Sequence, residues 1–413
     1  MIEAGSRAFW RATLALCLGS VMIFANVYVT QPLLPMIAAD FAISPLQAGW
    51  SFTVTTLTLG LSLLFYGPLS DALGRRGIIL LTMAGVTVTT LALAFTESYG
   101  LLLALRALQG FLLGGLPAIA IAYMGDEFSR RALLLAVGFY ISGNTLGGVG
   151  GRLVGGFVGE HFGWSQAFAV MACVSAVLLA AVALLLPPSR GFSAKPLRPA
   201  LMLRDLGGHL RNPLLLGAYL IGGLNFFIFI NQYSYATFML AEAPYGLSAQ
   251  FLGMLFLTYL SGTVGSALSG RVAQHLSQPL CMALGVLLLM CGTLVTLTPT
   301  LGAIIAGFLI NSFGFFFAHS TASSWVSRHA EQARASASSL YLVFYYLGAS
   351  CGGFYLSPFW HGYGWTGVVA ASLLILVVTL TLSLLLYRSE MRQPALGVVD
   401  VCGSVRKRQQ PLV

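Results

Sequence analysis

Gly67-Pro-Leu-Ser-Asp71-Ala-Leu-Gly74-Arg75-Arg76-Gly77 separates two apolar runs, residues 46–68 and 78–96. Each run is close to the roughly 20 residues that a helix needs to cross the hydrocarbon core of a bilayer. Glycines permit a tight turn between two helices, and Asp71 at its start can cap a helix or accept hydrogen bonds from arginine. The stretch therefore predicts a short charged hairpin between two membrane-spanning helices.

The whole chain has the composition of a membrane protein. Of its 413 residues, 57% are hydrophobic and 8% are charged, whereas soluble domains carry about 25% charged residues. This composition argues against a soluble enzyme, a nucleic-acid-binding protein and a disordered chain. Twelve apolar runs of spanning length are expected, at residues 12–34, 46–68, 78–96, 99–123, 132–157, 165–186, 213–239, 249–270, 279–297, 302–325, 336–358 and 364–387.

The placement of the basic residues predicts the orientation of these spans. All of the 21 Lys and Arg residues except Arg106 and Arg152 fall before the first span, after the last span or in alternate loops. The intervening loops carry Asp40, Glu97, Glu160 and Glu242 and no basic residue. By the positive-inside rule, both termini are expected in the cytoplasm. The net charge of +9 is thus explained by topology, and we expect no nucleic-acid partner.

An internal repeat divides the chain into two halves. At a shift of about 205 residues, Asn26 meets Asn231 and Tyr28 meets Tyr233. At the same shift, Tyr140, Gly143, Gly147 and Gly148 meet Tyr345, Gly348, Gly352 and Gly353. We therefore expect an all-α membrane protein with an N-terminal six-helix bundle at 1–190, a cytoplasmic linker at 191–212, a C-terminal six-helix bundle at 213–390 and a cytoplasmic tail at 391–413. Repeats in carriers place the substrate site at their interface near the midplane.

Four segments at matching topological places resemble motifs of the major facilitator superfamily. The hairpin resembles motif A, G-x-L-x-D-x-x-G-R-R/K, and Leu102-x-x-x-Arg106-x-x-Gln109-Gly110 resembles motif B, L-x-x-x-R-x-x-Q-G. Glu127-x-x-x-Arg131 resembles a superfamily pattern that follows the fourth helix. The helix-packing motif C of drug–proton antiporters, G-x8-G-x3-G-P-x2-G-G, is resembled by Gly138, Gly147, Gly151, Gly155 and Gly156. The resemblance covers about residues 10–390, and the nearest type is the bacterial exporter of the acriflavine-sensitivity kind.

One position departs from motif C, because Arg152 stands where that motif has proline. Proline bends a helix by removing a backbone N–H donor, which arginine does not do. The inference of drug antiport from motif C is therefore weakened, although its glycines still permit close helix packing.

Arg106 and Arg152 are the only charged residues inside the expected spans, and such charges usually face a cavity or a partner. Three interpretations stay open. Each arginine could bind helix-end carbonyls or an outer carboxylate, with Arg152 reaching outward to the membrane surface. The resemblance to motif B implies a part for Arg106 in proton coupling. The two cations together could bind an anionic group of a substrate.

Neutral polar residues mark a second set of candidates for the substrate or proton pathway. They concentrate in the first and seventh spans, which are repeat equivalents, and their alternative role is hydrogen bonding between helices. His319 is the only histidine in a span, and it either carries a proton or packs as a neutral side chain. The set comprises Asn26, Tyr28, Gln31, Gln109, Asn144, Asn231, Gln232, Tyr233, Asn311 and His319. The cysteines and the other histidines are too dispersed for a metal site, so we expect no metal and no cofactor.

The resemblance implies a monomeric transporter of the bacterial inner membrane that exports a small organic solute or drug in exchange for protons. A facilitator or symporter for a sugar or an organic anion is the alternative within transport. A membrane enzyme lacks support because no nucleophile elbow, paired carboxylates or metal cluster is evident. A sensor lacks support because only about 25 residues follow the last span.

The hairpin charges predict a conformational latch on the cytoplasmic face, formed by Gly67, Asp71, Gly74, Arg75, Arg76, Glu127 and Arg131. Such a latch would hold the two halves together in one state and release them in the other.

We expect Asp71→Asn to impair transport while membrane insertion stays intact, because the amide keeps the shape of the side chain and removes its charge. Transport by reconstituted protein and the yield of membrane-inserted protein measure the two effects. Normal transport by Asp71→Asn would contradict the latch.

Overall fold

The computed structural model describes all residues except 190, 193, 195–198, 331–333 and 393–413. The N-terminal half contains eight α-helices and one 3-10 helix within this description. These are α1 (Arg7–Tyr28), η1 (Gln31–Leu33), α2 (Leu34–Asp40), α3 (Pro45–Leu73), α4 (Arg75–Leu93), α5 (Tyr99–Leu113), α6 (Gly115–Glu127), α7 (Arg130–Phe162) and α8 (Trp164–Leu185).

The C-terminal half repeats this organisation after a connecting helix. Its elements are α9 (Pro199–Arg211), α10 (Pro213–Ala241), α11 (Ala249–Leu255), η2 (Phe256–Thr258), α12 (Tyr259–Val272), α13 (Gln278–Val295), α14 (Leu301–His329) and α15 (Arg334–Arg392). The predicted tail at 391–413 lies outside the described residues beyond Arg392.

The prediction of twelve spans is confirmed. Eleven helical stretches in the described part of the chain are long and apolar enough to cross a membrane. The last of them, Ser336–Met391, is 56 residues long, which suffices for two crossings. Within it Gly364 has φ 57° and ψ −141°, a non-helical conformation that separates two helices. Gly74, with φ 105°, likewise has a non-helical conformation and makes the turn between α3 and α4. A side chain at this position would strain the backbone.

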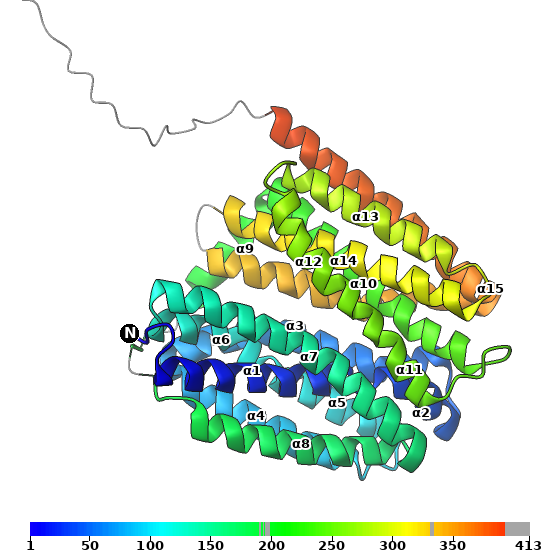
Figure 1. Ribbon diagram of the computed structural model, residues 1–413, viewed down its shortest axis with the longest axis horizontal. Helices are drawn as coiled ribbons and strands as arrows, with labels where there is room; N and C mark the ends of the chain where they lie inside the picture. The colour runs from blue at the N-terminus through cyan, green and yellow to red at the C-terminus, as the bar shows by residue number, and fades with distance from the viewer. Residues whose placement is uncertain (190, 193, 195–198, 331–333, 393–413) are drawn as a thin grey trace, which may run out of the picture.

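The two halves lie against each other as separate bundles. In Figure 1 the helices α1, α3, α4, α7 and α8 fill the lower part of the view, and α12, α13, α14 and α15 fill the upper part. We call the face with the Leu73–Arg75 turn the basic face, and the face with the α7–α8 turn at Gly163 the opposite face.

The first span, expected as one helix over 12–34, is broken. α1 ends at Tyr28, and η1 and α2 follow it with prolines in their first turns, Pro32 and Pro35. Proline removes a backbone donor, so the helix before it stops. The eighth span is also interrupted, by η2, although its sequence contains no proline. Both breaks leave backbone carbonyls for other groups to satisfy.

The linker predicted at 191–212 contains helix α9, which the sequence analysis did not anticipate. Leu206 of α9 packs against the apolar cluster that includes Leu215 and Tyr219 of α10. The linker therefore rests on the C-terminal half through an apolar contact.

Glycines bring the first and fifth spans into close contact. A Cβ added at Gly147, Gly151 or Gly155 of α7 would collide with the backbone of Val21, Ala25 or Val29. Gly156 approaches Ala249 of α11 in the other half in the same way. A helix with small residues every fourth position lets two backbones meet. The glycines of motif C therefore pack α7 against α1 of its own half and against α11 of the other half.

Gly138 does not share this role, contrary to the prediction. A Cβ there would meet nothing within 4 Å, whereas one at Gly143 would lie 2.8 Å from the carbonyl oxygen of Cys17. The fourth member of the contact on α1 is Gly143, one helical turn before Gly147. Gly348 and Gly352 make the matching approach to Gly223 and Phe227 in the C-terminal half.

We expect Gly147→Ala to lower the free energy of unfolding by about 1–3 kcal/mol, because the new methyl group overpacks the α1–α7 contact. Gly138→Ala is the matched control, since alanine fits there and favours the helix. Thermal unfolding of the two purified variants in detergent measures the difference. Equal unfolding temperatures would contradict the assigned contact.

Candidate functional site

Arg106 lies at the centre of a polar network within the N-terminal half. Its Nη1 and Nη2 atoms donate to the carbonyl oxygens of Asn26 (3.1 Å) and Val27 (3.2 Å), in the last turn of α1. Its Nε donates to the carbonyl oxygen of Ser51 (3.1 Å), and Nη1 also donates to Oε1 of Gln109. The side chain is 0% exposed.

These bonds explain why the sequence tolerates a charge here. The carbonyls at a helix C-terminus lack partners and carry partial negative charge. Arg106 supplies the donors for α1, which ends at Tyr28. The contacts favour the structural interpretation of Arg106, in which it binds helix-end carbonyls.

Asn26 and Gln109 complete this network through two residues that the sequence analysis missed. Thr90 donates to Oδ1 of Asn26 (2.8 Å) and accepts from Nε2 of Gln109 (2.6 Å). Nδ2 of Asn26 donates to Oγ of Ser175 at 2.8 Å. With the bond from Arg106 to Ser51, the network therefore joins five of the six spans of one half.

The C-terminal half holds a matching triangle of two amides and a threonine. Asn311 Nδ2 donates to Gln232 Oε1 (2.9 Å), and both Gln232 Nε2 and Asn311 Nδ2 donate to Thr293 Oγ1 (3.1 Å each). Gln232, Thr293 and Asn311 thus repeat Asn26, Thr90 and Gln109.

The hydrogen bonds revise the repeat by one residue in the first span of each half. Asn26 corresponds to Gln232 in its contacts, and not to Asn231 as the pattern match predicted. Asn231 instead donates to the carbonyl oxygens of Phe227 (3.0 Å) and Ala349 (2.9 Å), which ties α10 to α15. A shift of one residue turns a helical side chain by about 100°, which is why the two asparagines face different neighbours.

Arg152 lies between the two halves, and it is the feature that differs most from the expectation. It does not reach outward to the membrane surface, since its side chain is 1% exposed. Its Nε donates to Gln31 Oε1 (2.8 Å) and its Nη1 to the carbonyl oxygen of Gly148 (2.9 Å). The Nη2 atom has no hydrogen-bond partner among the described residues.

Three aromatic rings enclose the guanidinium. Its Cζ atom lies 3.9 Å from the ring centroid of Tyr28, 4.3 Å from that of Phe256 and 4.6 Å from that of Tyr259. Tyr28 belongs to the N-terminal half, whereas Phe256 and Tyr259 belong to the C-terminal half. A cation over a ring face in a dry site gains about 2 kcal/mol. We call Arg152 with Gln31, Tyr28, Phe256 and Tyr259 the arginine cage.

Most of the hydrogen bonds between the two halves lie toward the opposite face. The described residues provide three hydrogen bonds between side chains or backbone of the two halves, and two of them flank the arginine cage: Gln31 to Ser234 (3.3 Å) and the backbone N–H of Ala249 to Glu160 (2.9 Å). The third joins Thr56 and Ser350 (3.1 Å). Trp50 and Phe354 also meet across the halves, with ring centroids 6.0 Å apart.

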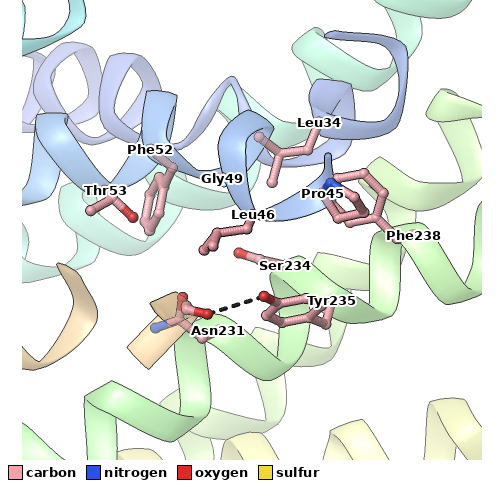
Figure 2. A pocket seen from close by; sticks show the side chains of 11 residues that line it. Leu34, Pro45, Leu46, Gly49, Phe52, Thr53, Asn231, Ser234, Tyr235 and Phe238 are labelled. Carbon is pink, nitrogen blue, oxygen red and sulfur yellow. Dashed lines mark hydrogen bonds between the residues drawn. The ribbon is translucent and has the colours of Figure 1, made fainter. Parts of the chain in front are cut away.

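A small pocket opens between the halves beside the arginine cage. Figure 2 shows Leu34, Leu46 and Phe52 of the N-terminal half facing Asn231, Ser234 and Phe238 of α10. Ser234 accepts the hydrogen bond from Gln31, which in turn accepts from Arg152. The pocket is thus two hydrogen bonds away from the guanidinium.

Of three other predicted residues, Asn144 and His319 bond elsewhere, whereas the Tyr233 ring packs against the cage rings of Phe256 and Tyr259, with centroids 5.3 and 4.9 Å apart. Asn144 accepts a hydrogen bond from Ser20 within the N-terminal half. Tyr233 bonds to Thr258 (2.6 Å) and Ser312 (2.7 Å) inside the C-terminal half. His319 Nδ1 shares a hydrogen bond with the hydroxyl of Tyr341 (2.9 Å), and its ring lies 4.6 Å from that of Tyr345.

The hairpin charges form a cluster on the basic face. Arg75 pairs with Asp71 (2.5 Å) and with Asp126 (2.9 Å), and Arg76 donates to the carbonyl oxygens of Ala183 and Leu186 at the end of α8. Glu127, which is buried, accepts from the backbone N–H of Gly191 (2.8 Å).

Every ion pair that the structure gives this cluster lies within the N-terminal half. Arg131 is exposed, and Gly67 has open space around it. The role of the cluster as a latch between the halves therefore stays a prediction.

Sequence reasoning named some partners of the two buried arginines, Asn26 and Gln109 for Arg106 and Tyr28 and Gln31 for Arg152. It missed the threonines of the two polar networks and the cage rings of the C-terminal half. Thr90 and Thr293 occupy matching places in the two halves, so the repeat could have identified them. Phe256 and Tyr259 gave no such signal, because their approach to Arg152 depends on the break at η2.

The comparison with known families agrees with this architecture. The profile of the Major Facilitator Superfamily matches residues 16–353. The chain belongs to the major facilitator superfamily. It is thus a multi-pass integral membrane protein with the fold and the relatives of membrane transporters.

Two relatives align over nearly their whole length. The chain is 37% identical to the uncharacterized MFS-type transporter YybF of Bacillus subtilis, with 94% of this chain and 96% of YybF covered. It is 36% identical to the inner membrane transport protein YnfM of Escherichia coli, with 94% and 93% covered. A bacterial homologue of the human lysosomal transporter Spinster has the same fold, with a TM-score of 0.78, 17% identity and 94% and 98% coverage.

We expect Arg106→Lys to lower the free energy of unfolding by about 2 kcal/mol, because an ammonium cannot reach the acceptors that the planar guanidinium bridges. Arg131→Lys, at an exposed position of the same charge, is the control. Thermal unfolding and transport are measured together. An unchanged unfolding temperature with lost transport would instead support a part for Arg106 in proton coupling.

Proposed function

We propose that the chain is a secondary active transporter that exports a small organic solute by alternating access, with protons as the coupling ion. The observation that carries the proposal is the arginine cage, because both halves supply its walls. Any rocking of one half against the other changes the surroundings of Arg152. A site of this kind, at the interface of repeats, is where carriers bind their substrates.

The contacts between the halves define the movement. To open the opposite face, the hydrogen bonds Gln31–Ser234 and Glu160–Ala249 must break, and Phe256 and Tyr259 must leave Arg152. These bonds are few and of moderate strength, so the two states can have similar free energies. The hairpin cluster on the basic face would then form the reciprocal contacts.

His319 is the candidate for proton coupling. No Asp or Glu lies within the expected spans, and the His319 ring lies 4.6 Å from the ring of Tyr345. A proton on His319, in the C-terminal half, would repel the guanidinium in the N-terminal half. Protonation would thus favour separation of the halves at the opposite face.

The direction and location of transport follow from sequence motifs, basic loops and relatives. The glycines of motif C resemble those of drug–proton antiporters, which supports export. The basic loops place both termini in the cytoplasm, and the similarity to YnfM supports the bacterial inner membrane. The six-helix halves enclose their own interface, so we propose a monomer, with a small molecule and the bilayer as its partners.

A second candidate function is a facilitator or symporter for an organic anion. The unpartnered Nη2 atom of Arg152 favours it, since a buried cation without a carboxylate attracts an anionic ligand. An imposed pH gradient would not change the rate at which such a transporter exchanges its solute.

Liposome flux separates the two candidates. Purified protein is first screened by thermal shift against a solute panel, and the stabilising solutes are then tested with and without a pH gradient. The antiporter accumulates solute against its gradient when protons flow the other way. A solute flux that is the same with and without the pH gradient would contradict proton coupling.

We expect His319→Gln to abolish the response to the pH gradient while solute exchange at equal pH continues, because the amide cannot take up a proton. His161→Gln, at the exposed end of α7, is the control. An undiminished pH response in His319→Gln would exclude His319 as the coupling group.

A further inference from the structure

The cation of the arginine cage has no carboxylate partner among the described residues. Arg152 is 1% exposed, and its hydrogen bonds end on the neutral oxygens of Gln31 and Gly148. The ion pairs that the structure describes involve Arg75 and His329 and not Arg152. The cage therefore carries a net positive charge in a site that water does not reach, where charges interact strongly.

Two polar groups of the cage stay unpaired. They are the Nη2 atom of Arg152 and the hydroxyl of Tyr259, whose ring centroid lies 4.6 Å from the guanidinium carbon. Buried donors in folded proteins are almost always paired, and an unpaired one calls for an explanation such as a ligand. Here one such donor comes from each half, the Nη2 atom from α7 and the hydroxyl from α12.

We propose that Arg152 and Tyr259 bind the anionic group of the transported solute, which is a carboxylate attached to an aromatic or apolar body. This inference rests on the proposed function, since it assigns the substrate class of the same site. A carboxylate accepts two hydrogen bonds at once, which the guanidinium fork and one hydroxyl can supply. One guanidinium without further cations matches a single negative charge.

The walls of the cage select the rest of the molecule. Tyr28, Phe256 and Tyr259 present ring faces, and Phe52 stacks beside Tyr28 with ring centroids 5.9 Å apart. Aromatic rings pair favourably with other rings in offset or edge-on arrangements. An aromatic carboxylate therefore satisfies both the charge and the walls.

We expect the anion to reach the cage through the pocket of Figure 2, whose lining does not include the cage residues themselves. Its wall residue Ser234 bonds to Gln31, and Gln31 occupies Nε of Arg152. When the halves separate, the Gln31–Ser234 bond breaks and Phe256 and Tyr259 move off the guanidinium. The incoming carboxylate then binds the exposed Arg152, and the hydroxyl of Tyr259 donates to it when the halves close again.

The test uses three probes of nearly equal shape and different charge: benzoate, benzamide and benzamidine. Each is titrated into the purified full-length protein in detergent, in the millimolar range, and binding is followed by thermal stabilisation and calorimetry. We expect benzoate to bind and the neutral and cationic probes to bind at least about tenfold more weakly.

Four variants assign the binding effect to particular residues. Arg152→Gln should abolish the preference for benzoate, Arg152→Lys should keep part of it, and Arg271→Gln, at an exposed arginine on the basic face, should leave it intact. Tyr259→Phe removes a hydroxyl that bonds to none of the described residues, so a purely structural role predicts unchanged benzoate affinity and unchanged or higher stability. Weaker benzoate binding with unchanged stability in Tyr259→Phe supports the proposal.

Three results would overturn it: no benzoate binding by the wild-type protein, equal binding of benzamide, or undiminished benzoate binding by a folded Arg152→Gln. Because these are equilibrium binding measurements, they do not depend on proton coupling or on direction. Failure of the liposome experiment would leave the substrate class standing, and failure here would leave alternating-access export of another solute standing.

Discussion

The contact between the Arg152 guanidinium and the rings of both halves is the interaction on which the arrangement of this protein depends. A charge at this depth is costly, by about 3 kcal/mol even in mild estimates, so it is retained only where the surroundings compensate it. Tyr28 and Gln31 compensate it from one half, and Phe256 and Tyr259 from the other. The two bundles are therefore joined through a group that loses part of its compensation when they separate.

The rest of the fold positions the Arg152 guanidinium between the two halves. The glycines of α7 bring its backbone against α1, and Gly148 leaves room for both the Tyr28 ring and the guanidinium. The break at η2 brings Phe256 and Tyr259 to the same point from the other side. Arg106 acts within one half and not between the halves. It donates hydrogen bonds to the last carbonyls of α1, and so keeps Tyr28 and Gln31 in position. One buried arginine holds a half together, and the other lies where the halves meet.

The sequence predicted the spans, the hairpin turn at Gly74 and the repeat, because apolar runs, glycines and basic loops are local signals. It did not distinguish Arg106 from Arg152, since both appear simply as charges in apolar runs and their partners lie on other spans. It aligned Asn26 with Asn231 by identity, whereas hydrogen bonding aligns it with Gln232, because orientation around a helix depends on tertiary packing. It also treated the broken first span as one helix, although the span contains Pro32 and Pro35. Hydropathy does not reveal such a break, because buried side chains satisfy the backbone groups that the break leaves free.

The most direct test of the central claim is the distance between the halves at their two ends, measured by double electron–electron resonance. One pair of spin labels is placed at Ala39 and Glu242 on the opposite face, and one at Leu73 and Arg328 on the basic face, all exposed positions. If Arg152 holds the opposite face closed, Arg152→Gln lengthens the Ala39–Glu242 distance and shortens the Leu73–Arg328 distance. Identical distance distributions in the wild-type protein and in Arg152→Gln would contradict the account.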